Sequence, residues 1–548
     1  MERAAINKEF VLCFDGTGYK FRGDEADSNV LKIYRMLDRN DTRQFHYYQP
    51  GFGTYTTSIW MSRGTADNSI KKWYFNAKDA ALGTAFDEHV MDGYRFLMRF
   101  YCPGDRIYIF GFSRGAYVAR LLAEMLDHVG ILEAGNEGKV RYIWSVFAKW
   151  GQRSNRVDTD QKEKDEIYQY MKALRETFCL PVSQIRFLGL FDTVNSIPRF
   201  EVSRDKFRFP FTAKTSAKVI RHAVGIDERR AKFREDLMSD SNSISLSVRE
   251  RIEGHRSTTS ESPGPGISTE ETFYRPVSRS RRQAVSIGDQ RMHTEFRNES
   301  LVRPRSPYES EGCPSEESED TTQDIEEIWF PGCHADIGGG FKLSEDEDFA
   351  LSHVPLVWMV HEAQRAGLRF DPTKLKQFHC FDDSTNDNDL RRYPQQNNVS
   401  QGSEANGEET KERSKFKYAL WRASTNGQIH DFLRYGHGVP WPTVLSWQLV
   451  EYLPFRRMNM QNDGSWKPIR WPLPLGERRD IPKQATIHGS AIRRMEVNPE
   501  YRPKNLIRGG KGKKKIPEVH GIGDWEVHAD WGCPVRETYR RKQPNKPK

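Results

Sequence analysis

The feature that most constrains this chain is the segment around Ser113, where a Gly-x-Ser-x-Gly motif lies between a strand pattern and a helix pattern. Residues 106–110 are a short apolar run, and residues 116–126 carry apolar side chains at helical spacing. Gly111 and Gly115 relieve the crowding of a sharp strand-to-helix turn, which holds the serine hydroxyl above the sheet. The pattern therefore predicts a nucleophilic serine, and the alternative is a serine that only caps the helix.

Three more apolar runs have the same design, at residues 10–14, 185–191 and 325–330. Short apolar strands with helices between them indicate an α/β fold, with a mostly parallel sheet and helices on both faces. In such folds the chemistry gathers at the carboxyl ends of the strands. The second of these runs ends at Asp192, and His334 lies four residues beyond the third.

A nucleophilic serine needs a general base and a carboxylate that orients the base. In α/β-hydrolases these residues follow in the chain order Ser, Asp or Glu, His, which here gives Ser113, Asp192 and His334. Asp192 could instead cap a turn, and His334 could be a hydrogen-bonded loop histidine. His430 and His488 also stand at plausible strand or loop ends and are alternative bases.

The first apolar run ends in an Asp-Gly-Thr-Gly motif that starts at Asp15. Its position suits one half of an oxyanion hole, with the amides of Gly16 or Thr17 acting beside the amide of Arg114. Phosphatases with a D-x-D-G-T motif are the competing interpretation, but Cys13 stands where their nucleophilic aspartate would be. A lone carboxylate such as Asp15 seldom binds a cation, so we expect it to support the site.

Four motifs stand together in this chain: F-D-G-T-G at 14–18, G-F-S-R-G-A at 111–116, L-F-D-T-V at 190–194 and W-F-P-G-C-H-A-D-I-G-G-G at 329–340. This set resembles the catalytic domain of type VI secretion phospholipase effectors, a family common in fungi. The resemblance covers roughly residues 8–235 and 325–365.

The resemblance implies an α/β-hydrolase-like serine esterase, with phospholipases A among the bacterial members. It also implies a triad of Ser113, Asp192 and His334. Asp336 falls in the last motif and is expected to support the site. The bacterial killing role is not expected to carry over.

Composition divides the chain into a catalytic core and polar additions. Residues 237–327 include 17 serines and are predicted to be a disordered insertion, and residues 391–414 a polar loop. We predict one catalytic domain over residues 8–495, followed by a basic tail at 506–548. From residue 493 onward, 15 basic and 7 acidic residues account for the whole net charge of +8. The main body is neutral, so nucleic-acid binding is not expected.

The cysteines and the N-terminal residues indicate the cellular compartment in which the protein is expected. Seven cysteines lack CxxC spacing, which argues against a disulfide framework and a structural zinc site. The first residues form no apolar signal segment, and no apolar run approaches the length of a membrane span. We expect a cytoplasmic protein that uses neither a metal nor another cofactor.

Two functions remain open from the sequence. The first is hydrolysis of carboxylic esters, with lipid or phospholipid acyl esters as expected substrates and an acyl-enzyme intermediate. The second is a catalytically silent scaffold regulated through the serine-rich insertion, where Ser278, Ser286 and Ser306 lie in motifs suited to phosphorylation.

Two further segments have open interpretations. Residues 441–471, rich in Trp, Pro and Phe, suit a lid or acyl-binding wall, or else ordinary core packing. The lysines at 511–515 suit weak contact with anionic membranes, or else a solvated charge run.

Overall fold

The computed structural model describes residues 7–51, 84–154, 161–182, 185–194, 215, 217–238, 323–345, 347–381, 407–454, 457–460, 466–482, 484–508 and 525–542. The predicted insertion at 237–327 lies outside these ranges except for its first two and last five residues, and residues 391–406 of the predicted polar loop also lie outside. The domain boundaries and the disorder of these segments therefore stay predictions.

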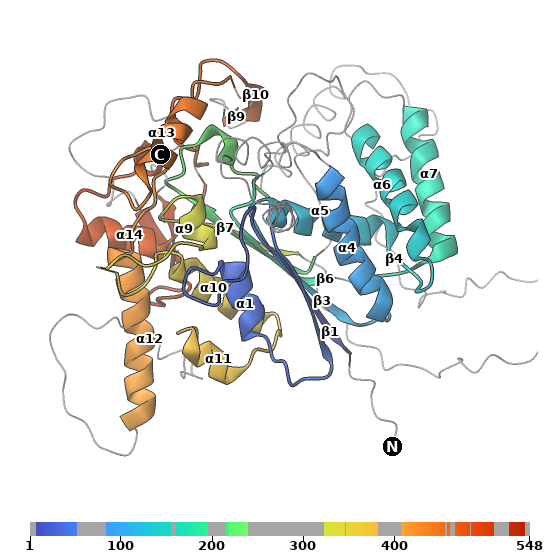
Figure 1. Cartoon of the computed structure of the whole chain (residues 1–548), viewed down its shortest axis with the longest axis horizontal. Coiled ribbons are helices and arrows are strands. Elements are labelled where there is room, and N and C mark those ends of the chain that lie inside the picture. Colours follow the sequence, from blue (N-terminus) through green and yellow to red (C-terminus); the bar gives the residue numbers. More distant parts are fainter. Residues whose placement is uncertain are drawn as a thin grey trace, which may run out of the picture.

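Within the described residues, one sheet contains nine strands in the order β12-β13-β11-β8-β7-β6-β3-β1-β2 (Figure 1). Seven neighbouring strands, from β11 to β2, run parallel, and β13 and β12 add an antiparallel hairpin at one edge. The strands are β1 (Glu9–Phe14), β2 (Gln44–Gln49), β3 (Arg106–Phe112), β6 (Ile185–Phe191), β7 (Val219–Gly225), β8 (Asp324–Phe330), β11 (Thr486–His488), β12 (Trp525–Ala529) and β13 (Thr538–Arg541). The α/β prediction is confirmed, and the four strands expected from the sequence are β1, β3, β6 and β8.

Helices cover both faces of this sheet (Figure 1). One face carries α4 (Thr84–Phe100), α5 (Arg114–Val129), α6 (Val140–Ser154) and α7 (Gln161–Phe178). The other carries α1 (Asn29–Met36), α10 (His353–Arg365), α11 (Pro372–Gln377) and α12 (Gly407–Asn426). None of the described helices is long and apolar enough to cross a membrane.

The central strands are buried on both faces, so their side chains feed two cores alternately. Phe10, Leu12 and Phe14 of β1 enter the core under α4 and α5, while Val11 and Cys13 enter the core under α1 and α10. This explains why the strands appear in the sequence as continuous apolar runs.

The carboxyl-terminal segments add structure that the sequence did not indicate. Residues 525–541 belong to the predicted basic tail, but they contain β12 and β13, which lengthen the main sheet. Trp525 is buried in a third core, together with α14 (Gly489–Val497) and α15 (Lys504–Arg508), and the Arg541 guanidinium lies 5.0 Å from its ring. Each strand is short, which gives a weak periodic signal between glycine-, lysine- and proline-rich stretches.

Smaller elements complete the description. Two small two-stranded sheets pair β4 (Ile131–Leu132) with β5 (Cys179–Leu180), and β9 (Arg457–Met460) with β10 (Trp466–Ile469). The short helices are η1 (Glu137–Lys139), η2 (Ala231–Phe233), α9 (His334–Gly338) and α13 (Trp441–Val450). Of these, η2, α9 and α13 lie at the candidate site.

Candidate active site

Ser113 stands at the turn between β3 and α5 in a strained conformation. Its φ of 59° and ψ of −124° lie where residues other than glycine are rare, and its side chain makes no capping hydrogen bond to α5. A Cβ on Gly111 would lie 2.4 Å from the Ala116 Cα, and one on Gly115 would lie 2.3 Å from the Phe14 carbonyl oxygen. The motif therefore needs both glycines because the backbone packs too closely for any side chain.

The three predicted site residues meet at the carboxyl ends of their strands. His334 Nε2 lies 2.8 Å from Ser113 Oγ, and His334 Nδ1 lies 2.5 Å from Asp192 Oδ2. All three side chains are at least 95% buried. With the proton on Nδ1, the serine hydroxyl donates to the imidazole and the imidazole donates to the carboxylate, which is the arrangement of a nucleophile, base and orienting acid.

Asp192 has a second partner, Arg479, which the sequence analysis did not single out. The Arg479 guanidinium donates from Nη1 to Oδ1 at 2.6 Å and from Nη2 to Oδ2 at 2.8 Å, a bidentate pair that is buried. The Gly225 amide also donates to Oδ1, at 2.8 Å. Asp192 is therefore held as an acceptor and not as a turn-capping residue.

These contacts set the ionisation of the site. Burial works against a charged Asp192, but the Arg479 charge and hydrogen bonds, helped by His334, hold the pKa of this carboxyl well below its usual range. Burial lowers the pKa of His334, against the opposing influence of Asp192. At neutral pH the carboxylate is ionised and the imidazole is neutral, so the imidazole can accept a proton.

The backbone and ring of His334 are fixed by neighbours. It opens α9, where the Cys333 amide donates to Asp336 Oδ2 at 2.9 Å and the His334 amide donates to Glu228 Oε2 at 3.1 Å. The imidazole lies between two aromatic rings, 4.9 Å from Phe112 and 4.7 Å from Phe233. Asp336 thus accepts a hydrogen bond at the start of α9, and none of the hydrogen bonds described for its carboxylate joins it to a triad side chain.

The two alternative histidines are occupied elsewhere. His430 Nδ1 lies 2.7 Å from Asp336 Oδ1, and its ring stacks on Phe341. The nitrogens of His488 lie 2.8 Å from Ser490 Oγ and 2.9 Å from the Val535 carbonyl. Both therefore have structural partners in the described fold.

The loop after β1 lies against the elbow through Gly115 and is organised by Asp15. Its Oδ2 accepts hydrogen bonds from the Ser28 and Tyr48 hydroxyls, each at 2.7 Å, and its Oδ1 accepts from the Gly16 amide at 2.7 Å. The Gly16 amide is thus already engaged. The Thr17 hydroxyl is buried without a hydrogen-bond partner among the described residues, and Arg114 is the first residue of α5.

Comparison with protein families matches this chain, over residues 8–362, to the catalytic domain of the Tle1-like phospholipase effectors of type VI secretion systems. The chain belongs to this family.

Individual proteins also resemble this Tle1-like chain. An uncharacterized protein of Saccharomyces cerevisiae, YEL023C, is 27% identical over 572 residues, covering 92% of this chain and 81% of the yeast protein. A crystal structure of an uncharacterized protein from Pseudomonas aeruginosa is 18% identical with a TM-score of 0.27, and the match spans 67% of this chain and 47% of that chain.

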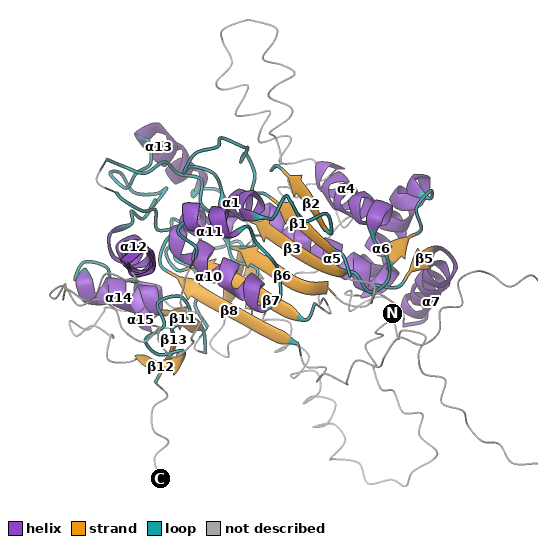
Figure 2. Ribbon diagram, turned by 90° about the horizontal axis from the view of Figure 1, so that it is seen from below, coloured by secondary structure: helices purple, strands orange, loops and turns teal. Residues whose placement is uncertain are grey.

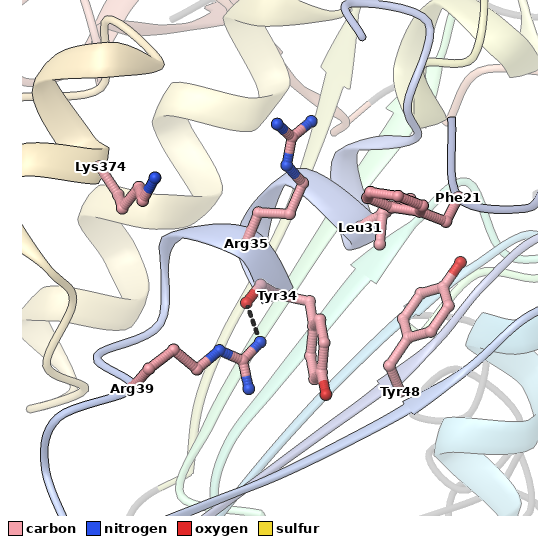
Figure 3. Close-up of a pocket in the computed structure, with 7 residues that line it drawn as sticks. All are labelled: Phe21, Leu31, Tyr34, Arg35, Arg39, Tyr48 and Lys374. Atoms are coloured by element: carbon pink, nitrogen blue, oxygen red, sulfur yellow. Dashed lines mark hydrogen bonds between the residues drawn. The ribbon is translucent and has the colours of Figure 1, made fainter. Parts of the chain in front are cut away.

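A cavity of about 400 Å³ lies beside α1 of the Tle1-like domain (Figure 3). It is lined by Phe21, Leu31, Tyr34, Arg35, Arg39, Tyr48 and Lys374. No triad residue lines the cavity, so it is separate from the triad. Tyr48, one of its lining residues, donates a hydrogen bond to Asp15. Within the described ranges, no group of three or more His, Cys, Asp or Glu side chains is placed to hold a metal ion.

Proposed function

We propose that this chain is a serine hydrolase that cleaves carboxylic esters, and that its substrates are acyl esters of lipids or phospholipids. The observation that carries the proposal is the continuous pair of hydrogen bonds from Ser113 through His334 to Asp192, with the serine held on a strained turn. A purely structural serine would have no need of positive φ, or of a buried base fixed by its own carboxylate.

The geometry supports the following sequence of steps. His334 takes the Ser113 proton while Oγ attacks the ester carbonyl, and Asp192 stabilises the imidazolium that forms. The oxyanion of the tetrahedral intermediate accepts hydrogen bonds from the Arg114 amide and from the Thr17 amide. His334 then protonates the leaving alcohol, and water hydrolyses the acyl-enzyme by the same route.

Family membership supports the lipid part of the proposal, because the family is described as phospholipase effectors. A phospholipase A-like reaction releases a fatty acid and a lysophospholipid. The test is incubation of the full chain with a panel of phospholipids and short-chain esters, with product analysis by mass spectrometry. We expect release of fatty acid that Ser113→Ala abolishes. Release that survives in Ser113→Ala would contradict the role proposed for Ser113, and an inert wild-type protein would leave the scaffold function as the better account.

The predicted basic tail and the predicted location belong to the same proposal. The lysines at 511–515 lie outside the described residues, and we propose that they add weak attraction to anionic lipid. Removing residues 543–548 and neutralising 511–515 would then lower binding to anionic vesicles. We also propose a cytoplasmic location, which imaging of a tagged chain can test.

A further inference from the structure

Helix α13 (Trp441–Val450) is mostly apolar and yet lies at the surface. Its sequence, Trp-Pro-Thr-Val-Leu-Ser-Trp-Gln-Leu-Val, contains no charged residue, and in this fully described helix Val444 alone is buried. A surface helix ordinarily shows a polar face to water and an apolar face to the core, and an apolar helix is ordinarily buried. Exposed Trp and Leu side chains gathered on one helix indicate an interaction surface.

The apolar surface extends beyond the helix because two loops are attached to it. Gln448 Nε2 donates to the Leu433 carbonyl at 3.1 Å, and the Gly476 amide donates to Glu451 Oε2 at 3.2 Å. The side chains that together form what we call the α13 surface are between 42% and 67% exposed: Trp441, Leu445, Leu449, Tyr452, Leu453 and Leu475.

The inner side of α13 reaches the candidate base through one aromatic ring. The Trp447 ring lies 5.5 Å from Phe233, whose ring lies 4.7 Å from His334. Glu451, just after the helix, accepts the Ala231 amide at 2.8 Å, which ties α13 to the same short helix η2. The α13 surface is thus fixed beside the site.

The charges around the α13 surface favour one kind of occupant. On the described segments that form it, residues 431–453 and 470–477, each acidic side chain is engaged: Asp431 pairs with Arg229, Glu477 pairs with Arg234, and Glu451 is buried. Arg434, on the first of these segments, is exposed. An apolar patch with Trp and Tyr, edged by an exposed arginine, complements a phospholipid bilayer, in which phosphates lie above the acyl chains.

We propose that the α13 surface docks this chain onto the surface of a phospholipid bilayer. This inference rests on the proposed function and deepens it, since docking would present membrane lipids to Ser113. Trp441, Leu445 and Leu449 insert at the boundary between headgroups and acyl chains, while Arg434 faces the phosphates.

The test is co-sedimentation of the full chain, carrying Ser113→Ala so that the lipid stays intact, with phosphatidylcholine vesicles with and without phosphatidylserine. The variant is Trp441→Ser with Leu445→Ser and Leu449→Ser. A matched control is Trp531→Ser with Val497→Ser, at positions that are 70% and 53% exposed. Trp531 follows β12, which Figure 2 shows well apart from α13. We expect the α13 variant to lose roughly tenfold or more in apparent vesicle affinity and the control to match its parent.

Equal binding by the α13 variant and its parent would overturn the proposal. A parent that binds no vesicle would also overturn it. If such a parent forms a dimer that the same substitutions break, the α13 surface serves self-association instead. The single changes Trp441→Ser and Leu449→Ser, at 67% and 63% exposed positions, repeat the test with little risk to folding.

Failure of the docking proposal can be told apart from failure of the proposed function. With Ser113 intact, the α13 variant should hydrolyse a soluble short-chain ester like wild type while losing activity on vesicles. If no ester is cleaved by any form, but vesicle binding still depends on α13, then the hydrolase proposal fails and the docking surface stands.

Discussion

Asp15 and Asp192 are both buried carboxyls at the ends of parallel strands, and their surroundings drive their ionisation in opposite directions. Asp15 meets neutral donors, namely two hydroxyls and one amide, and burial raises its pKa to about 6. Asp192 meets the guanidinium of Arg479, and its pKa lies well below the usual range although burial opposes this. Both carboxyls follow a strand, so the Arg479 guanidinium accounts for the difference between their pKa values.

The role of a carboxyl at the end of a strand depends on whether its neighbours keep it charged. An aspartate that keeps its charge when buried can stabilise an imidazolium, as the proposed reaction requires of Asp192. An aspartate that gives up its charge near neutral pH is suited to holding a loop, as Asp15 does. Three sets of substitutions separate the two roles, taken below from the largest expected effect to the smallest.

Replacing Asp192 by Asn should have the largest effect. The amide keeps the volume of the carboxyl but presents no charge and can favour the wrong imidazole tautomer, so we expect kcat to fall about 10⁴-fold. Ester hydrolysis under saturating substrate measures this, with circular dichroism as the folding control. A drop of less than tenfold would show that Asp192 is not the orienting acid.

Replacing Arg479 by Met should have an intermediate effect, because the guanidinium is a positioning group that touches Asp192 and not Ser113. We expect kcat to fall roughly 10²-fold with little change in KM. Without the guanidinium, the charge of Asp192 is less compensated and favours the imidazolium, so the acid limb of the pH–rate profile should move to higher pH.

The control for Arg479 is Arg494→Met, which removes another buried arginine that donates to the Ser424 and Gly427 carbonyls. This control should lose stability and keep the pH profile. An Arg479→Met protein with an unmoved profile would mean that the guanidinium only holds the fold together.

Replacing Asp15 by Asn should have the smallest effect on turnover. The Ser28 and Tyr48 hydroxyls can accept as well as donate, so the loop can keep its bonds, and we expect kcat within about tenfold of wild type. The distinctive effect of Asp15→Asn is on stability, because the ionised Asp15 carboxyl of the wild-type protein is unfavourable in the fold.

The sign of that stability effect follows from the raised pKa of Asp15. In the unfolded chain this carboxyl loses its proton near the ordinary aspartate pKa of 3.8, and in the fold it does so at about 6. Between these values the native protein binds more protons than the unfolded chain, so stability falls as the pH rises through this window. The amide of Asp15→Asn cannot titrate. The unfolding midpoint of the variant should therefore rise relative to that of wild type as the pH increases from about 4 to about 7. A constant difference in midpoint across this range would contradict the raised pKa.

The sequence predicts the strands that carry continuous apolar runs. β1, β3, β6 and β8 follow from such runs because strands buried on both faces need apolar side chains at every position. β12 and β13 could not be predicted in the same way, since they are short and pair at an edge, where Glu526 and His528 are exposed.

At the site, the sequence identifies the three residues that the structure brings within hydrogen-bond distance, because each follows a recognisable strand or motif. Arg479 has no such signal: it lies 287 residues from Asp192 in an irregular segment, and its role depends on tertiary packing alone. The Gly16 amide shows the reverse case, since its motif suggests an oxyanion donor while Asp15 already accepts its hydrogen bond.

The most direct test of the account is covalent labelling by a fluorophosphonate, which reacts with a serine only when a base activates it. We expect one adduct on the intact protein, mapped by peptide mass spectrometry to Ser113, and its loss in Ser113→Ala and His334→Ala. An adduct on another residue, or no adduct on a folded wild-type protein, would contradict the proposal that Ser113, His334 and Asp192 form a working catalytic triad.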